Sequence, residues 1–454
     1  MSMTRPVVNV DTVLDGVRFQ GLPLLVLIFA VLILVLDGFD IQIIGFAAPA
    51  LTQEFGIERK ALGPVLAAGL LGMALGAFAG GQAGDRFGRR PTLIASMALV
   101  GAATLAAAAT DSLAGLTWWR LLTGIGLGGT LPNATALMAE FAPPRWRSQA
   151  IAVTIVGVPI GGMIGAAIAA EIIPAFGWRV LFVVGAALPL ALAAVMYFVL
   201  PESARFLTTR AQRHGELVAL LGRIFPDRSW SADSQFVLAA PAETAAAGLR
   251  TLFTRPFLRD TLGAWLAFLT NIFVVYAFFN WIAVVLTSVD LDIATAVRAS
   301  LVFNLAGVVG AMGNAWVIAR YGSRWPLTAM ALLAAAALFW LARLPLGGAA
   351  SFALLPPLLA GIAVAGLAIN AVQIGMYAVV AHVYPTACRS SGVGWALGVG
   401  RLGGILSSFA GGLLLARGSS HDFFGGIGLV MLLAGIGVLL IHNHLPAQDR
   451  QRHG

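Results

Sequence analysis

Four ionisable residues stand inside long apolar stretches, where a charged side chain needs either a partner or a function. They are Asp37, Asp40, Arg120 and Arg401. A charged side chain at the centre of a membrane costs about 2.5–3.5 kcal/mol on insertion scales. Asp37 and Asp40 are three residues apart, so both carboxyls lie on one face of a helix. Their repulsion in a medium of low dielectric should leave at least one able to take up and release a proton near neutral pH. We expect this pair to serve in proton coupling.

The two arginines supply the opposite charge. Arginine stays protonated, and its planar fork suits a carboxylate through two parallel hydrogen bonds. Arg401 is therefore the candidate anchor for an anionic substrate. Arg120 lies nearer the outer end of its stretch, where three roles are open: contact with substrate, snorkelling to the membrane surface, or pairing with an aspartate. The charges of the two acids and the two arginines also sum to zero, so the alternative is a set of ion pairs with a purely structural role.

Aromatic and amide side chains in the second half of the chain could line a ring-shaped pocket. Amides in lipid seek hydrogen-bond partners, which favours a shared polar site. Any one of these residues is equally well explained by helix packing or lipid contact. The candidates are Tyr276, Phe279, Asn280, Trp281, Asn370, Gln373, Tyr377 and Trp395.

Charges also crowd the short turns between apolar stretches. Ion pairs across helix ends that form in one conformation and break in the other would act as a gate. The positive-inside rule explains why arginines lie in these turns, but it does not explain the acids Asp85 and Glu140. A gate is therefore favoured over a plain topology signal. The candidate gating residues are Asp85, Arg86, Arg89, Arg90, Glu140, Arg147 and, at the position matching Arg147 in the second half, Arg389.

The elements that must position these residues follow from composition. Of 454 residues, 59% are hydrophobic and 11% are charged, whereas soluble domains carry roughly 25% charged residues. This excludes an ordinary soluble enzyme, a disordered chain and a nucleic-acid binder. The single cysteine, Cys388, excludes a disulfide and a thiolate metal cage, and we expect neither metal nor cofactor. The glycine runs near 124–129 and 398–404 lie in apolar stretches and indicate close helix packing.

Apolar stretches long enough to cross a membrane number twelve, at roughly 20 residues per span. They fall near 22–47, 61–83, 92–110, 117–138, 150–170, 180–200, 261–286, 299–318, 326–342, 353–380, 391–416 and 424–441. The predicted fold is an all-α membrane protein with twelve transmembrane helices in two pseudo-symmetric six-helix bundles.

The predicted division is an N-terminal bundle over 1–200, a central cytoplasmic loop over 201–260 and a C-terminal bundle over 261–454. An internal repeat supports it, because Gly84–Arg90 aligns with Ile318–Arg324. Such repeats build a midplane site whose access alternates as one half rocks against the other. With both termini inside, 20 cations are cytoplasmic and six are outside, as the positive-inside rule expects.

Several motifs resemble those of a known family. Gly84–Arg90, Arg120-Leu-Leu-Thr-Gly-Ile-Gly126 and Pro201-Glu-Ser-Ala-Arg205 resemble signatures of the major facilitator superfamily. Asp37-Gly-Phe-Asp40 and the segments 384–389 and 394–401 are similar to the aromatic acid:proton symporters within it. The resemblance implies uptake of a benzoate-like or hydroxybenzoate-like acid with protons across a bacterial inner membrane. It assigns Asp37 and Asp40 to coupling or binding, and Arg389 and Arg401 to transport. We expect no nucleic-acid partner, and we expect the protein to function as a monomer.

The sequence departs from the family pattern in places, which keeps rivals open. Ala319 stands where the first loop signature has Asp85, so gating could be lopsided, and Ile282 follows Trp281 where the family tends to have proline. Gly157–Gly162 is also like a drug-antiporter motif, so proton-coupled drug export is the first alternative, with carriers of other organic acids or sugars beside it. A membrane enzyme is a further alternative, but the apolar stretches of this sequence contain no nucleophile or metal motif that such an enzyme would need. A passive channel is the third, and it would not accumulate substrate against a gradient.

Overall fold

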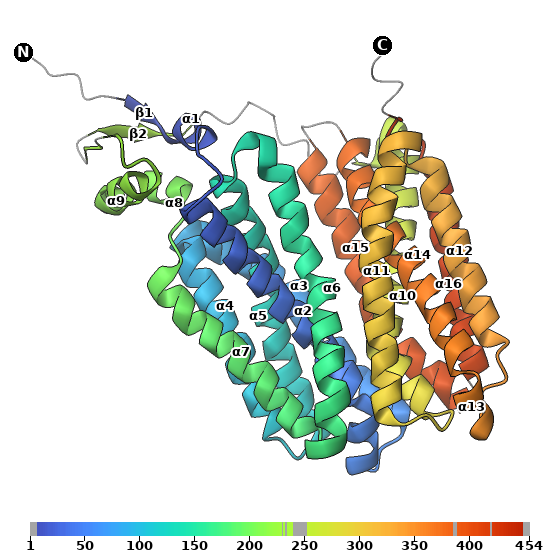
Figure 1. The fold of residues 1–454 in the computed structure, drawn as a ribbon. Coiled ribbons are helices and arrows are strands. Elements are labelled where there is room, and N and C mark those ends of the chain that lie inside the picture. The colour runs from blue at the N-terminus through green and yellow to red at the C-terminus, as the bar shows by residue number, and fades with distance from the viewer. Residues whose placement is uncertain are drawn as a thin grey trace, which may run out of the picture.

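The structure, a computed structural model, describes residues 7–228, 230–231, 234–238, 252–384, 388–417 and 420–447 and is mostly helical (Figure 1). The first bundle contains α2 (Leu22–Glu54), α3 (Gly63–Phe87), α4 (Arg89–Ala108), α5 (Leu113–Phe141), α6 (Pro144–Phe176) and α7 (Trp178–Val199). The second contains α10 (Arg255–Thr287), α11 (Ile293–Tyr321), α12 (Arg324–Ala342), α14 (Leu355–Val383), α15 (Arg389–Arg417) and α16 (Ser420–Leu440).

Shorter elements lie before, between and after these helices. They are β1 (Val7–Asn9), α1 (Val10–Asp15), η1 (Arg59–Leu62), α8 (Ala204–Thr208), η2 (Ala211–Arg213), α9 (His214–Ile224), β2 (Gln235–Val237) and α13 (Ala349–Ala353). Strand β1 pairs in parallel with β2, with Val8 opposite Phe236. Asp11 in α1 also accepts a hydrogen bond from Arg205 Nε at 2.7 Å. Strand β1 and helix α1 are thus attached to the segment that joins the bundles.

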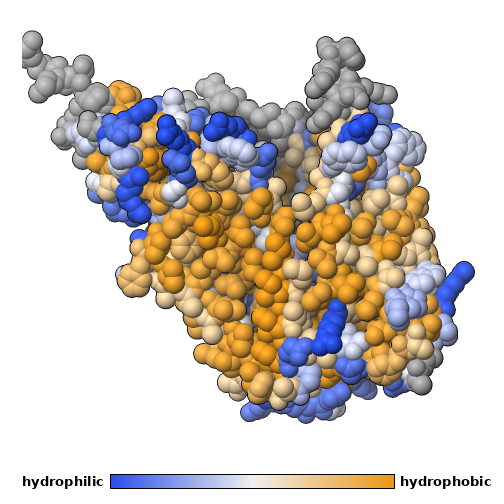
Figure 2. All heavy atoms as spheres, viewed as in Figure 1, coloured by the Kyte–Doolittle hydropathy of each residue, from blue (hydrophilic) through white to orange (hydrophobic). Residues whose placement is uncertain are grey.

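In the described part of the chain, eleven helices are long and apolar enough to cross a membrane. Helix α5 is the twelfth long helix of the bundles, and glycines, Pro132 and Asn133 lower its hydropathy. On the face shown in Figure 2, a mostly apolar band lies between two ends where polar residues gather. The predicted fold class is therefore confirmed. The seventh span begins earlier than predicted, at Arg255, because its polar first turns continue the helix.

Glycines end the helix before the aligned loop in each half. Gly88 follows α3 with φ of 106°, and Gly322 follows α11 with φ of 79°. Residues with a Cβ rarely adopt such positive φ values, so these glycines allow a sharp reversal into α4 and α12. The two positions coincide in the internal repeat, and each bundle therefore turns at the same point.

The two bundles meet mainly at one end. We call the end that carries β1 and the residues after α16 the proximal end, and the opposite end the distal end (Figure 1). A Cβ added at Gly45 of α2 would lie 2.0 Å from the carbonyl oxygen of Phe279 in α10. One added at Gly63 of α3 would lie 3.4 Å from the carbonyl oxygen of Ser408 in α15. Both contacts fall in the distal part of their helices, so the bundles pack backbone to backbone there.

Candidate functional site

A buried ion pair joins the first and fourth long helices. Arg120 Nη1 of α5 lies 2.9 Å from Asp40 Oδ2 of α2, and Arg120 Nη2 donates to the Asp40 carbonyl oxygen at 3.2 Å. Thr104 of α4 donates to the other carboxylate oxygen at 2.9 Å. The side chains of Asp40 and Arg120 are 0% and 4% exposed. Of the roles predicted for Arg120, the structure contains the pairing with an aspartate.

Asp37 has a different environment, one turn away on the same helix. Its Oδ2 accepts a short hydrogen bond from the Thr130 hydroxyl of α5. Its Oδ1 is buried and has no partner among the described residues. No described cation forms an ion pair with Asp37, so a proton on this carboxyl would remove an uncompensated charge. The two predicted acids are therefore chemically distinct.

A small cavity lies between the bundles beside the ion pair. Arg120 and Asn280 are its polar side chains, and the remainder of its wall is apolar. Its volume is about 10 Å³, too small for an aromatic ring, so a substrate would enter only after the helices separate. The lining residues are Ile41, Ile44, Leu66, Gly69, Leu70, Met73, Arg120, Leu127 and Asn280.

Arg401 of α15 is partly buried and faces α10 and α14. Its charge lies near Tyr276 of α10 and Tyr377 of α14. No carboxylate of the described residues lies within ion-pair distance of it. Three residues on, a Cβ added at Gly404 would lie 3.0 Å from the Tyr276 ring and 3.2 Å from Leu70 of α3, so this stretch of α15 borders the other bundle. Among the described residues Arg401 thus has no counter-charge, and its role in binding an anion stays a prediction.

The other predicted substrate residues occupy several places. Gln373 accepts a hydrogen bond from Asn271 at 2.7 Å, and Asn280 donates to the Ser408 hydroxyl at 3.3 Å. Trp281 is fully buried and donates to the carbonyl oxygen of Ser407, which places it in the packing between α10 and α15. Trp395 is 46% exposed and stacks on a neighbouring tryptophan. Roles for these residues in binding stay predictions.

Four of the predicted gating residues form side-chain contacts within the first half of the chain. Arg89 Nη1 lies 2.5 Å from Glu140 Oε1, whose other oxygen accepts from Ser203. Arg90 bonds to the Tyr197 carbonyl oxygen, and Arg147 pairs with Asp15 at 3.1 Å. The described residues provide no ion pair for Asp85, which is exposed, as is Arg86. The side chain of Arg389 lies outside the described part. Movement at these contacts stays a prediction.

Sequence reasoning missed Thr104, Thr130 and Glu202 as partners of the predicted site residues. Thr104 and Thr130 hold the two aspartates, and Glu202 accepts backbone hydrogen bonds from Arg89 and Arg90 at 2.9 and 3.1 Å. Threonine is common in membrane helices, so its sequence position carries no signal. Glu202 stands in the Pro201–Arg205 motif, which could have indicated it.

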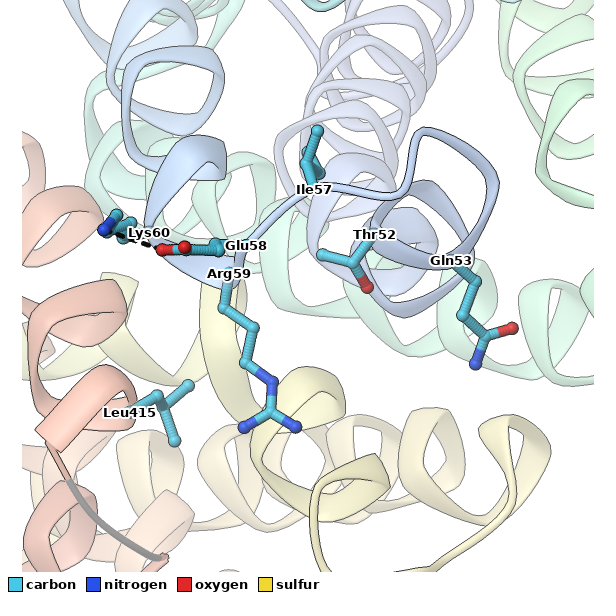
Figure 3. Close-up of a pocket in the computed structure, with 7 residues that line it drawn as sticks. All are labelled: Thr52, Gln53, Ile57, Glu58, Arg59, Lys60 and Leu415. Atoms are coloured by element: carbon cyan, nitrogen blue, oxygen red, sulfur yellow. Dashed lines mark ion pairs between the residues drawn. The ribbon is translucent and has the colours of Figure 1, made fainter.

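A second, larger pocket opens at the distal end (Figure 3). Its volume is about 490 Å³, and its mostly polar wall is formed by the last turn of α2, the residues that follow it up to the start of η1, and one residue of α15. None of the residues predicted to bind substrate lines it. The lining residues are Thr52, Gln53, Ile57, Glu58, Arg59, Lys60 and Leu415.

Comparison with known proteins places the chain in a family. The model of the Major Facilitator Superfamily matches residues 30–355 and 299–454. A gallate transporter of Pseudomonas putida is 34% identical over 433 residues, covering 95% of this chain and 94% of that protein. The 4-hydroxybenzoate transporter PcaK of the same species is 35% identical over 397 residues, covering 87% of each.

Solved structures agree on the fold. The inward open conformation of the xylose transporter XylE from E. coli has a TM-score of 0.72 and 17% identity, covering 93% of this chain and 97% of that one. The resemblance inferred from the motifs is confirmed by matches along both halves of the sequence. The chain belongs to the major facilitator superfamily.

Proposed function

We propose that this protein imports a small aromatic carboxylate together with protons by alternating access. The names of its relatives support the substrate class, because they include transporters of gallate, 4-hydroxybenzoate and 3-(3-hydroxy-phenyl)propionate. The observation that carries the proposal is the pair of unmatched groups in the helices: the Asp37 carboxyl has no cation, and Arg401 has no carboxylate, among the described residues. A proton and an anion would neutralise them.

The proposed cycle begins with the site open to the outside. A proton from the outer solution binds the Asp37 carboxylate, and the substrate carboxylate binds the Arg401 guanidinium. Both charges in the membrane interior are then compensated, so the halves can rock without carrying a bare charge. On the inner side the substrate leaves, and Asp37 releases its proton to the cytoplasm.

Asp40 and Arg120 act together in this scheme. Their ion pair is complete in the closed cavity, and Thr104 satisfies the remaining carboxylate oxygen. Protonation of Asp40 would free Arg120 to contact a second polar group of the substrate, since Arg120 and Asn280 share the cavity wall. We assign Asp37 as the first choice for the coupling proton and Asp40 as its partner. Tyr276, Trp281, Gln373 and Trp395 complete the proposed binding set.

We further infer the setting of the protein. Its relatives are bacterial, which supports the inner membrane. The excess of cations in the proximal loops supports cytoplasmic termini. We propose that it functions as a monomer and transports its substrate chemically unchanged, with Asp85, Arg86, Arg89, Arg90, Glu140, Arg147 and Arg389 controlling the inner opening.

The test is uptake of labelled 4-hydroxybenzoate by the purified protein in liposomes with an acidic exterior. We expect accumulation that a protonophore abolishes, with competition by gallate and benzoate but not by xylose. Arg401→Gln should raise the KM by about tenfold to a hundredfold, because a hydrogen bond to a charged group contributes about 1.5–3 kcal/mol. Arg343→Gln, at an exposed arginine, is the matched control.

Three outcomes would contradict the proposal. These are absence of accumulation, accumulation only in inverted vesicles, which indicates export, and competition by xylose alone. A normal KM for Arg401→Gln would leave aromatic acid transport standing and move the anchor elsewhere.

A further inference from the structure

We infer that Gln42 of α2 and Asn304 of α11 form a latch that closes the distal end of the molecule and positions the halves in the conformation described here. Gln42 Nε2 donates to Asn304 Oδ1 at 3.2 Å, and Asn304 Nδ2 donates to Gln42 Oε1 at 2.9 Å. The two residues are 0% and 1% exposed. The inference rests on the proposed alternating access, since a latch has a function only if the halves separate.

Few polar contacts cross between the halves. Among the described residues, one other side-chain bond joins them, from Arg298 of α11 to Glu171 of α6 at 2.7 Å. Its side chains are 59% and 73% exposed, and exposed ion pairs contribute little because water and salt screen them. The buried amide pair is therefore the stronger polar link across the interface.

The surroundings show that this pair is enclosed. A Cβ added at Gly162 of α6 would lie 1.9 Å from Gln42 Nε2 and 3.0 Å from Asn304 Oδ1. The α6 backbone therefore covers the amides, and a side chain at this position would displace them. Asn304 Nδ2 also donates to the Ser300 carbonyl oxygen at 2.9 Å, which orients the amide toward α2. Buried amides that lose their partner are costly, so the pair favours the closed state.

The latch lies next to the proposed site. Gln42 is two residues beyond Asp40, and Ile41 and Ile44 on either side of it line the central cavity. Asn280 of α10, in the same half as Asn304, also lines this cavity. Separation of the second half from α2 would therefore break both hydrogen bonds and open the cavity wall between α2 and α10. Water would then have to satisfy the two amides. The latch therefore couples the position of the helix that carries both aspartates to the opening of the site.

The experiment measures access without any substrate. In a Cys388→Ser background, Leu66→Cys places a thiol in the cavity wall near the distal end of α3. A membrane-impermeant maleimide is added to the distal face of membrane vesicles. Gln42→Ala and Asn304→Ala should each speed labelling about fivefold to tenfold, the effect expected for losing a buried hydrogen-bonded pair. The double variant should label no faster than either single one, because all three lose the same link.

Two further variants separate a latch from general loosening. Asn314→Ala removes another buried amide of α11, one that bonds to the Ala371 carbonyl within the second half, and should leave labelling unchanged. Gln42→Asn combined with Asn304→Gln keeps both amides and the total side-chain length, and should restore slow labelling. The inference is overturned if the single alanine variants label at the parent rate, or if the exchanged pair labels as fast as they do. Neither result bears on the substrate, so the proposed function is judged separately.

Discussion

At the scale of residues, α2 carries two buried carboxyl groups that differ in their partners. Asp40 has a cation and a hydroxyl donor, whereas Asp37 has only the Thr130 hydroxyl. A buried ion pair is retained because breaking it leaves a bare charge, not because it adds much stability over an apolar pair. The position of Asp37, without a counter-charge, suits a group that changes protonation during a cycle.

This difference predicts different consequences for two like substitutions. Asp40→Asn should destabilise the protein by about 3–5 kcal/mol, because Arg120 stays charged and buried without a partner. Asp37→Asn should change the melting temperature little, since Thr130 can donate to the amide oxygen, but it should abolish accumulation while exchange of labelled substrate continues. Tryptophan fluorescence during heating and paired uptake and exchange assays measure these effects.

The matched control is the double variant Asp40→Asn with Arg120→Gln. It removes both charges and should recover most of the lost stability. Equal melting temperatures for the two single variants would show that the ion pair does not support the fold. Full accumulation by Asp37→Asn would remove it from coupling.

At the scale of elements, the segment after α7 holds the start of α4. Glu202 Oε1 accepts from the backbone nitrogens of Arg89 and Arg90, which begin α4, and of Ser203 at 2.8 Å. Free N–H groups and the helix dipole make a helix start favourable for an anion. A Cβ at Gly88 would lie 2.2 Å from Glu202 Oε2, so the loop glycine also leaves room for this carboxylate.

Glu202→Ala should therefore lower stability by about 1–3 kcal/mol, the cost of leaving buried donors unmatched. We expect the thermal unfolding of the purified protein to shift downward. Glu216→Ala is the control, because Glu216 forms an exposed pair with Arg213 three residues earlier, and such pairs contribute less than about 1 kcal/mol. Equal shifts for both variants would show that Glu202 does not cap α4.

Sequence predicts the elements well because a membrane imposes length and apolarity. The length of the apolar stretches predicts the long helices. The same stretches mark four residues as charged groups inside the membrane: Asp37, Asp40, Arg120 and Arg401. The sequence does not predict which aspartate pairs with Arg120, because that depends on how α2 packs against α5. Asn304 and Gln42 are 262 residues apart, and nothing local marks them as a pair.

At the scale of the whole molecule, the charges in the helices determine the energetics of transport. The Asp40–Arg120 pair is neutral, and one proton on Asp37 with one carboxylate on Arg401 neutralises the remaining two charges. A cycle that carries one proton and one monoanion moves no net charge. A cycle in which Asp40 also carries a proton moves one positive charge inward.

The membrane potential separates these cycles. We expect the accumulation ratio at a fixed pH gradient to be unchanged when an inside-negative potential of roughly 100 mV is imposed with potassium and valinomycin, because a cycle that moves no net charge gains no free energy from the field. A cycle with a second proton would gain about 2.3 kcal/mol per 100 mV, and its accumulation ratio would rise by well over tenfold. The same assay on Asp40→Asn with Arg120→Gln provides the control, since only one acid remains. Stimulation of the parent but not of this variant would show that Asp40 carries the second proton.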